Sequence, residues 1–113
     1  MTKLDKPPFG PPCLWGIRGS GKTLAALNSP WQPVHIIDTE NSSRDYFEDQ
    51  DRLIQLKYIP EKFTRTVTMS WDTYLKEYCR ICGIKADGTK IDDGTHYGTI
   101  VLDTAGQITS WVA

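Results

Sequence analysis

Apolar residues in this chain gather in short runs that are separated by longer amphipathic and polar segments. Residues 13–15 (Cys-Leu-Trp), 34–37 (Val-His-Ile-Ile) and 99–102 (Thr-Ile-Val-Leu) are apolar or β-branched runs typical of buried strands. The alternation of residues 53–59 predicts one more strand, which ends before Pro60. Because helix-forming segments lie between these runs, the pattern indicates an α/β fold with a mostly parallel sheet.

Three segments between the predicted strands have the composition of helices. Residues 23–28 (Thr-Leu-Ala-Ala-Leu-Asn) are good helix formers, and residues 44–47 follow an Asn-Ser-Ser sequence that is suited to capping a helix. Residues 71–82 carry a stripe of apolar side chains, with Ser70 expected to cap this helix and Gly83 to end it. The predicted elements therefore alternate between strand and helix along the whole chain.

The strongest chemical motif lies between the first predicted strand and the first predicted helix. Residues 16–23 read Gly-Ile-Arg-Gly-Ser-Gly-Lys-Thr and match G-x-x-x-x-G-K-[ST] without a mismatch. Glycines let the backbone approach phosphate oxygens closely, so that many N–H groups can donate to them. In such a loop Lys22 reaches the β- and γ-phosphates, and the Thr23 hydroxyl is a ligand of Mg²⁺. We expect the nucleotide to contact Gly16, Ile17, Arg18, Gly19, Ser20, Gly21, Lys22 and Thr23.

A second nucleotide-site motif lies near the end of the chain. The apolar run of residues 99–102 closes on Asp103, in the form of a buried strand that delivers a carboxylate at its C-terminal end. Such a carboxylate can hold, directly or through water, the Mg²⁺ that the Thr23 hydroxyl also faces. Thr23 and Asp103 are therefore the expected metal ligands. Residues 38–40 (Asp-Thr-Glu) likewise follow a predicted strand, and ligands of open α/β folds bind at that end of the sheet.

From residue 14 to about residue 111 the chain resembles the RecA-like P-loop ATPases, and most closely the small nucleotide-binding ATPases of bacteriophages that are related to single-strand-annealing recombinases. The matching segments are residues 16–23, 36–40 and 100–104. The resemblance implies a three-layer α/β sandwich of the P-loop NTPase type that binds ATP with Mg²⁺. It also implies ATP hydrolysis in phage DNA recombination, with DNA or recombination and replication proteins as partners, and assembly of several copies of the chain.

The same resemblance assigns roles in hydrolysis. Glu40 matches the position of the family's glutamate that polarises the attacking water, which implies that Glu40 is the general base and that Lys22 is the catalytic cation. A solvated loop carboxylate is the alternative for Glu40, because the match around it is looser than the match in the phosphate loop. A nucleotide-binding module that does not hydrolyse ATP is the second functional hypothesis.

A rival hypothesis comes from residues 103–107 (Asp-Thr-Ala-Gly-Gln), which spell the switch motif of small GTPases, where the glutamine orients water. Two features weigh against it. Lys22 and Asp103 are much farther apart in sequence than in Ras-like proteins. The only candidate for reading guanine, residues 89–92 (Thr-Lys-Ile-Asp), precedes Asp103 instead of following it. ATP is therefore the expected nucleotide.

The chain is short for a nucleotide-binding α/β domain. Residues 1–12 contain four prolines and are expected to be a flexible lead-in, and residues 13–113 to be the N-terminal part of a P-loop NTPase domain. RecA-like domains place a later strand between the phosphate-loop strand and the metal-aspartate strand, and little sequence follows Asp103. The domain is thus expected to be truncated after that strand. Three hypotheses remain: a fragment of a longer ATPase, a compact binder whose flanking strands pair directly, or a chain completed by a partner.

Composition limits the remaining classes of function. The net charge is −1, so no basic surface for tight nucleic-acid binding is expected from this segment alone. No apolar stretch approaches the length of a membrane span, and three cysteines without an export signal favour a reducing compartment. The cytoplasm, that of the host for a phage protein, is the expected location. Cys79 and Cys82 form a lone C-x-x-C, which favours core thiols over a zinc site.

Overall fold

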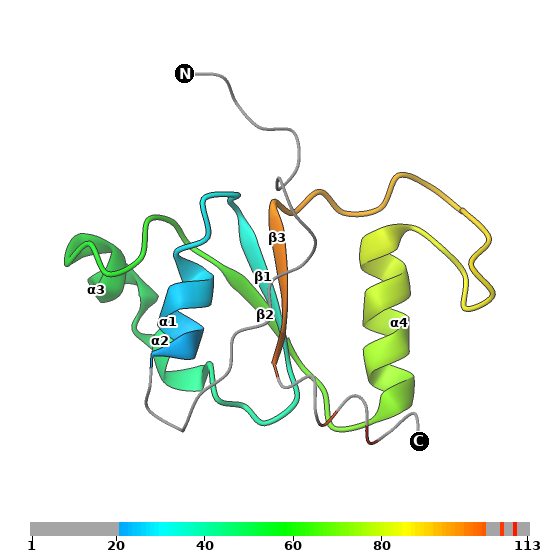
Figure 1. Ribbon diagram of the computed structural model, residues 1–113, viewed down its shortest axis with the longest axis horizontal. Coiled ribbons are helices and arrows are strands. Elements are labelled where there is room, and N and C mark those ends of the chain that lie inside the picture. The colour runs from blue at the N-terminus through cyan, green and yellow to red at the C-terminus, as the bar shows by residue number, and fades with distance from the viewer. Residues whose placement is uncertain (1–20, 104–106, 108–109, 111–113) are drawn as a thin grey trace.

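The computed structural model describes residues 21–103, together with residues 107 and 110. Within these residues a three-stranded parallel sheet carries helices on both of its faces (Figure 1). The strands are β1 (Val34–Asp38), β2 (Thr64–Val67) and β3 (Thr99–Asp103), and the helices are α1 (Lys22–Leu27), α2 (Arg44–Glu48), α3 (Gln50–Gln55) and α4 (Trp71–Cys82). The predicted α/β class and its parallel sheet are confirmed.

Several segments with a predicted structure or role lie outside the described residues. These are the lead-in of residues 1–12, the strand expected at residues 13–15 and residues 16–20 of the phosphate loop. Residues 104–106, in the middle of the switch-like sequence, also lie outside. The part of the phosphate-loop motif that the structure describes is Gly21, Lys22 and Thr23.

The sheet has the order β2-β1-β3, and all five residues of the middle strand β1 are buried. A strand in this position has neighbours on both sides and helices over both faces, which explains its run of β-branched residues. The parallel register with β3 aligns Val34 with Thr99 and Asp38 with Asp103. Two aspartates that are far apart in the sequence therefore lie on neighbouring strands at the carboxyl end of the sheet.

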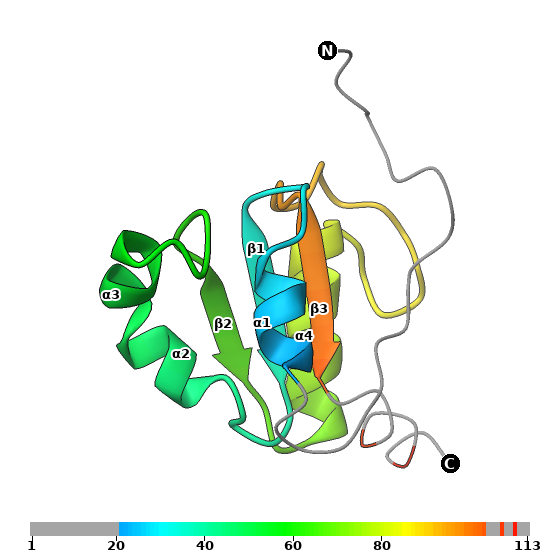
Figure 2. The ribbon, with the colours of Figure 1, turned by 60° about the vertical axis from the view of Figure 1, so that its left-hand side comes forward.

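Two apolar clusters hold the helices against the sheet. The cluster on the α1 face consists of Leu27, Val34, Ile36, Ile59 and Phe63. The cluster on the α4 face consists of Ile37, Tyr74 and Ile81. Alternate residues of β1 thus point to opposite faces, and α1 and α4 cover opposite sides of the sheet (Figure 2). Full burial of a side chain such as Ile36 contributes roughly 1.5–3 kcal/mol to the stability of this arrangement.

Helix α4 begins and ends where its sequence predicts. The Ser70 side chain accepts a hydrogen bond from the backbone N–H of Thr73 at 3.3 Å, which satisfies one donor of the first turn. Gly83 ends the helix with a φ of 68°, and a Cβ at this position would collide with Asp92. α4 has 12 residues. No helix in the described part of the chain, α4 included, is long and apolar enough to cross a membrane.

The strand predicted at residues 53–59 is wrong. The chain forms α3 over part of this segment, and the strand that pairs with β1 on this side is β2, farther along the chain. Leu53 and Ile54 both pack against the α1-face cluster, which adjacent residues of a strand could not do. Leu56 and Tyr58, which alternation would bury with Ile54, are exposed. β2 itself reads Thr-Arg-Thr-Val, so its sequence contains no apolar alternation that would have predicted it.

A polar network surrounds the buried His35 of β1. The ring nitrogen Nδ1 lies 2.6 Å from Thr64 Oγ1, and Nε2 lies 3.1 Å from Thr66 Oγ1. The ring stacks on Tyr97 with centroids 4.7 Å apart, and Nε2 is 3.4 Å from Glu77 Oε1. Burial lowers the pKa of His35, and the neighbouring Glu77 carboxylate opposes this effect only in part.

We expect the free energy of unfolding to fall as the pH drops below about 6.5, the ordinary pKa of histidine. In that range the unfolded chain binds a proton at His35 that the folded chain resists, because the pKa of His35 is lowered in the folded state. Urea denaturation at several pH values between about 5 and 7 should give a flatter dependence for His35→Gln than for the wild type. The control variant His96→Gln, at an exposed position, should keep the wild-type slope. A wild-type slope in His35→Gln would contradict this role.

Candidate functional site at the carboxyl end of the sheet

The beginning of α1 and the carboxyl ends of the strands lie at the same end of the sheet. α1 runs antiparallel to the strands, so its N-terminal end lies at the edge where β1 and β3 end (Figures 1 and 2). Lys22 is the first residue of α1, and Asp103 is the last residue of β3. Glu40 follows β1 by two residues, in the turn at this edge. The described residues of the predicted site are therefore gathered at one end of the sheet.

Gly21 shows why the motif has a glycine directly before the helix. It precedes α1 with a φ of 87°, and its carbonyl oxygen accepts a hydrogen bond from the N–H of Ala25 at 2.9 Å. No described atom lies within 4 Å of a Cβ built there, so the constraint is the left-handed backbone and not space. Lys22 and Thr23 follow in the first turn, where both are half-buried. The other residues expected to contact the nucleotide, outside the described part, are Gly16, Ile17, Arg18, Gly19 and Ser20.

Asp38, the last residue of β1, is fully buried and holds the loop that follows. Its Oδ1 accepts hydrogen bonds from the backbone N–H groups of Glu40 at 3.1 Å and Ser42 at 3.2 Å. Its Oδ2 accepts hydrogen bonds from the backbone N–H of Ser43 at 2.8 Å and from the Ser43 hydroxyl at 2.5 Å. Burial raises the pKa of Asp38, but these hydrogen bonds together outweigh it, so the pKa lies below its usual value. The ionised carboxylate therefore shapes the turn between β1 and α2.

Arg65 of β2 also holds this turn through hydrogen bonds. Asn41 has a φ of 59°, and its side-chain oxygen accepts a hydrogen bond from Arg65 Nη2 at 2.5 Å. Nη1 of the same guanidinium donates to Ser43 Oγ at 3.4 Å. The guanidinium also lies over the Phe47 ring, 5.4 Å from its centroid. Arg65 thus stabilises the left-handed residue of the turn and the first helix after it.

The turn also contacts Asp103 on the neighbouring strand. The Ser42 hydroxyl donates to Asp103 Oδ2 at 2.8 Å, and it lies 3.5 Å from Asp38 Oδ1. The backbone N–H and the hydroxyl of Thr39 donate to the carbonyl oxygen of Asp103, at 2.6 Å and 3.1 Å. The turn therefore holds Asp103 by its backbone and by one oxygen of its side chain.

Sequence reasoning named the residues of this turn but missed the role of Asp38 and of the hydrogen bonds that it accepts. It assigned chemistry to Glu40, which is exposed, while the buried carboxylate at the strand end is that of Asp38. The signal was present, because Asp38 closes an apolar run in the same way as Asp103 does. Ser43 precedes α2 as the capping sequence predicted, but its side chain makes no capping hydrogen bond and donates to Asp38 instead.

The oxygen donors at this edge fit a hard cation such as Mg²⁺. A threonine hydroxyl and a carboxylate, here those of Thr23 and Asp103, are ligands that Mg²⁺ accepts, and phosphate and water oxygens complete its coordination in nucleotide sites. Within the described residues no group of three or more His, Cys, Asp or Glu could hold a metal ion alone. A structural zinc site takes four protein ligands, more than the Thr23 hydroxyl and the Asp103 carboxylate supply.

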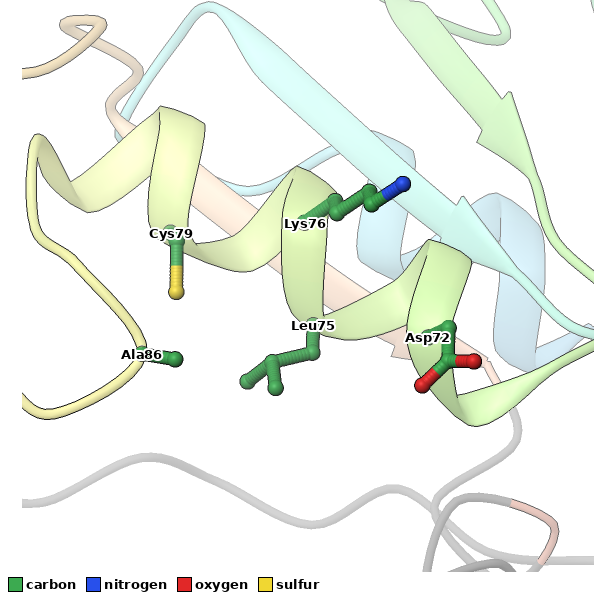
Figure 3. Close-up of a pocket in the computed structure, with 5 residues that line it drawn as sticks. All are labelled: Asp72, Leu75, Lys76, Cys79 and Ala86. Atoms are coloured by element: carbon green, nitrogen blue, oxygen red, sulfur yellow. The ribbon is translucent and has the colours of Figure 1, made fainter.

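Helix α4 carries a separate, open hollow of about 350 Å³. It is lined by Asp72, Leu75, Lys76, Cys79 and Ala86 (Figure 3). Cys79 and Cys82 are free thiols, both half-buried on this helix. The hollow lies along α4, which covers the side of the sheet opposite α1.

Comparison with protein-family models, with curated proteins and with solved structures returned no match to this chain. The functional assignment therefore depends on the motif in residues 16–23 and on the geometry of the sheet end. The resemblance to P-loop ATPases stays a prediction.

We expect Asp38→Asn to destabilise the protein by about 2–4 kcal/mol. The substitution removes a buried, negatively charged acceptor of hydrogen bonds and turns an amide NH₂ group toward backbone N–H donors. Asp51→Asn is the matched control, because Asp51 is exposed and pairs with Lys62 at the surface, and its effect should stay within about 0.5 kcal/mol. Urea denaturation at neutral pH measures both variants. Equal stability of the two would show that Asp38 does not hold the turn.

Proposed function

We propose that the chain is a P-loop protein that binds ATP with Mg²⁺ at the carboxyl end of its sheet. One observation carries this proposal. Helix α1, which begins directly after Gly21, and strand β3, which ends in Asp103, place the end of the phosphate-loop motif and a carboxylate at the same edge. In open α/β sheets this edge is where phosphate ligands bind.

The described residues would bind the nucleotide in two ways, by charge on the phosphates and by coordination of the cation. The Lys22 ammonium would bind oxygens of the β- and γ-phosphates, while Thr23 and Asp103 would hold the cation. When bound, Mg²⁺ neutralises negative charge on the phosphates and orients them. Asp103 suits this role because Thr39 and Ser42 already fix its backbone and one of its carboxylate oxygens.

We further propose that Glu40 makes this site an ATPase. Its carboxylate would accept a proton from water while the water oxygen forms a bond to the γ-phosphorus and the bond to the bridging oxygen of ADP breaks. The backbone N–H of Glu40 is held by buried Asp38, so the turn carries this exposed carboxylate at the sheet end. Following the resemblance to phage ATPases, the work driven is DNA recombination, with DNA or a recombination protein as partner.

Lys22→Ala should weaken the binding of ATP with Mg²⁺ at least about tenfold, since it removes charge-assisted contacts to phosphate oxygens. Lys62→Ala is the control, because Lys62 is exposed and pairs with Asp51 away from the sheet end. Isothermal titration calorimetry compares the two variants with the wild type. A wild type that binds no nucleoside triphosphate would overturn the proposed function, and equal affinities in the two variants would remove Lys22 from the site.

Glu40→Gln should leave ATP binding intact and lower the rate of hydrolysis about 100-fold or more, because the amide cannot accept the proton. Glu48→Gln is the control, since Glu48 is an exposed carboxylate on α2 that pairs with Arg44. Phosphate release under saturating ATP measures the rate. Turnover that survives in Glu40→Gln would make Glu40 a solvated carboxylate and Gln107 the next candidate. ATP binding without any turnover in the wild type would support the non-hydrolysing module.

A further inference from the structure

We propose that Ser42 is a positioning residue, which orients the Asp103 carboxylate for the cation and links it to the turn that carries Glu40. This role rests on the proposed function. Ser42 belongs to neither of the two nucleotide-site motifs and lies in the turn between β1 and α2. Its side chain is exposed, so it does not serve the apolar core.

The contact between Ser42 and Asp103 joins two segments that are far apart in the sequence and lie side by side through the pairing of β1 with β3. The Ser42 hydroxyl donates to Asp103 Oδ2 at 2.8 Å, an ordinary length for an O–H···O hydrogen bond. An aspartate at the end of a strand can rotate about both of its side-chain torsions, and a hydrogen bond to one oxygen restricts both. Ser42 therefore reduces the ordering that Asp103 must undergo when it takes a cation.

The hydroxyl can act in this way because the backbone of the turn is held. The Ser42 N–H donates to Oδ1 of fully buried Asp38 at 3.2 Å. Thr39 makes two further hydrogen bonds to the Asp103 carbonyl oxygen. The turn and the end of β3 are thus connected through backbone and side chain. Because the backbone of Ser42 is held in place, its hydroxyl can orient the Asp103 carboxylate.

One buried oxygen connects Ser42 with Glu40. The N–H of Glu40 donates to Asp38 Oδ1 at 3.1 Å, next to the N–H of Ser42 on the same atom. A change at Asp103 on cation binding therefore reaches the Glu40 backbone through Ser42 and Asp38. The cation site and the proposed base are in this way coupled through the hydrogen bonds of a single turn.

The magnesium dependence of ATP affinity tests the positioning role. In calorimetric titrations with ATP, the gain in affinity on adding Mg²⁺ should be about tenfold smaller in Ser42→Ala than in the wild type, with the magnesium-free affinity unchanged. Ser42→Thr keeps the hydroxyl at an exposed position and should restore the gain. Ser29→Ala removes a hydroxyl that lies 2.7 Å from Thr99 Oγ1 at the opposite end of β3, so it controls for lost stability and should keep the full gain.

Amide hydrogen exchange provides a readout that is independent of affinity. At saturating ATP, adding Mg²⁺ should slow amide exchange at Glu40 and Ser42 in the wild type and in Ser29→Ala. In Ser42→Ala the slowing at Glu40 should be lost. A wild type without magnesium-dependent ATP binding would overturn the proposed function and the role of Ser42 together. Wild-type binding with an unchanged magnesium gain and unchanged slowing in Ser42→Ala would overturn the role of Ser42 alone.

Discussion

This site depends on the hydrogen bonds that the buried, ionised carboxylate of Asp38 accepts from the turn after β1. Taking a carboxylate out of water costs several kcal/mol unless hydrogen bonds replace its hydration. Asp38 receives this replacement from three backbone N–H groups and one hydroxyl, all supplied by the five residues that follow it. Because the donors come from one short segment, the requirement to satisfy the charge also determines the shape of the turn. This turn places Ser42 and Glu40 at the carboxyl end of the sheet.

The parallel sheet turns this local arrangement into a site. Burial of β1 between two helical layers fixes its register, and the register aligns Asp38 with Asp103 on the next strand. Since α1 runs back along the sheet, its first turn arrives at the same edge (Figure 1). Segments near both ends of the described chain thus lie at the same end of the sheet. This geometry is the physical basis for the proposal that phosphate and cation bind at one place.

Elements with strong local signals could be predicted from the sequence. The helix of residues 71–82 has a cap, an apolar stripe and a terminal glycine, and the β1 and β3 strands are apolar runs. β2 could not be predicted, because its polar sequence becomes a strand only by pairing with β1. At the site, Lys22 and Asp103 follow from motifs, whereas the burial of Asp38 and its partners depends on strand register and on a turn with a left-handed residue. Neither of these is encoded in a short motif.

The most direct test of the central claim is a map of where ATP with Mg²⁺ contacts the chain. Backbone amide chemical shifts measured by NMR during such a titration locate the ligand without assuming a reaction. We expect the largest changes on residues 21–23, on the turn of residues 39–43 and on Asp103, the three segments that lie at this end of the sheet. Changes confined to the α4 hollow around Cys79, or no changes at all, would contradict the central claim.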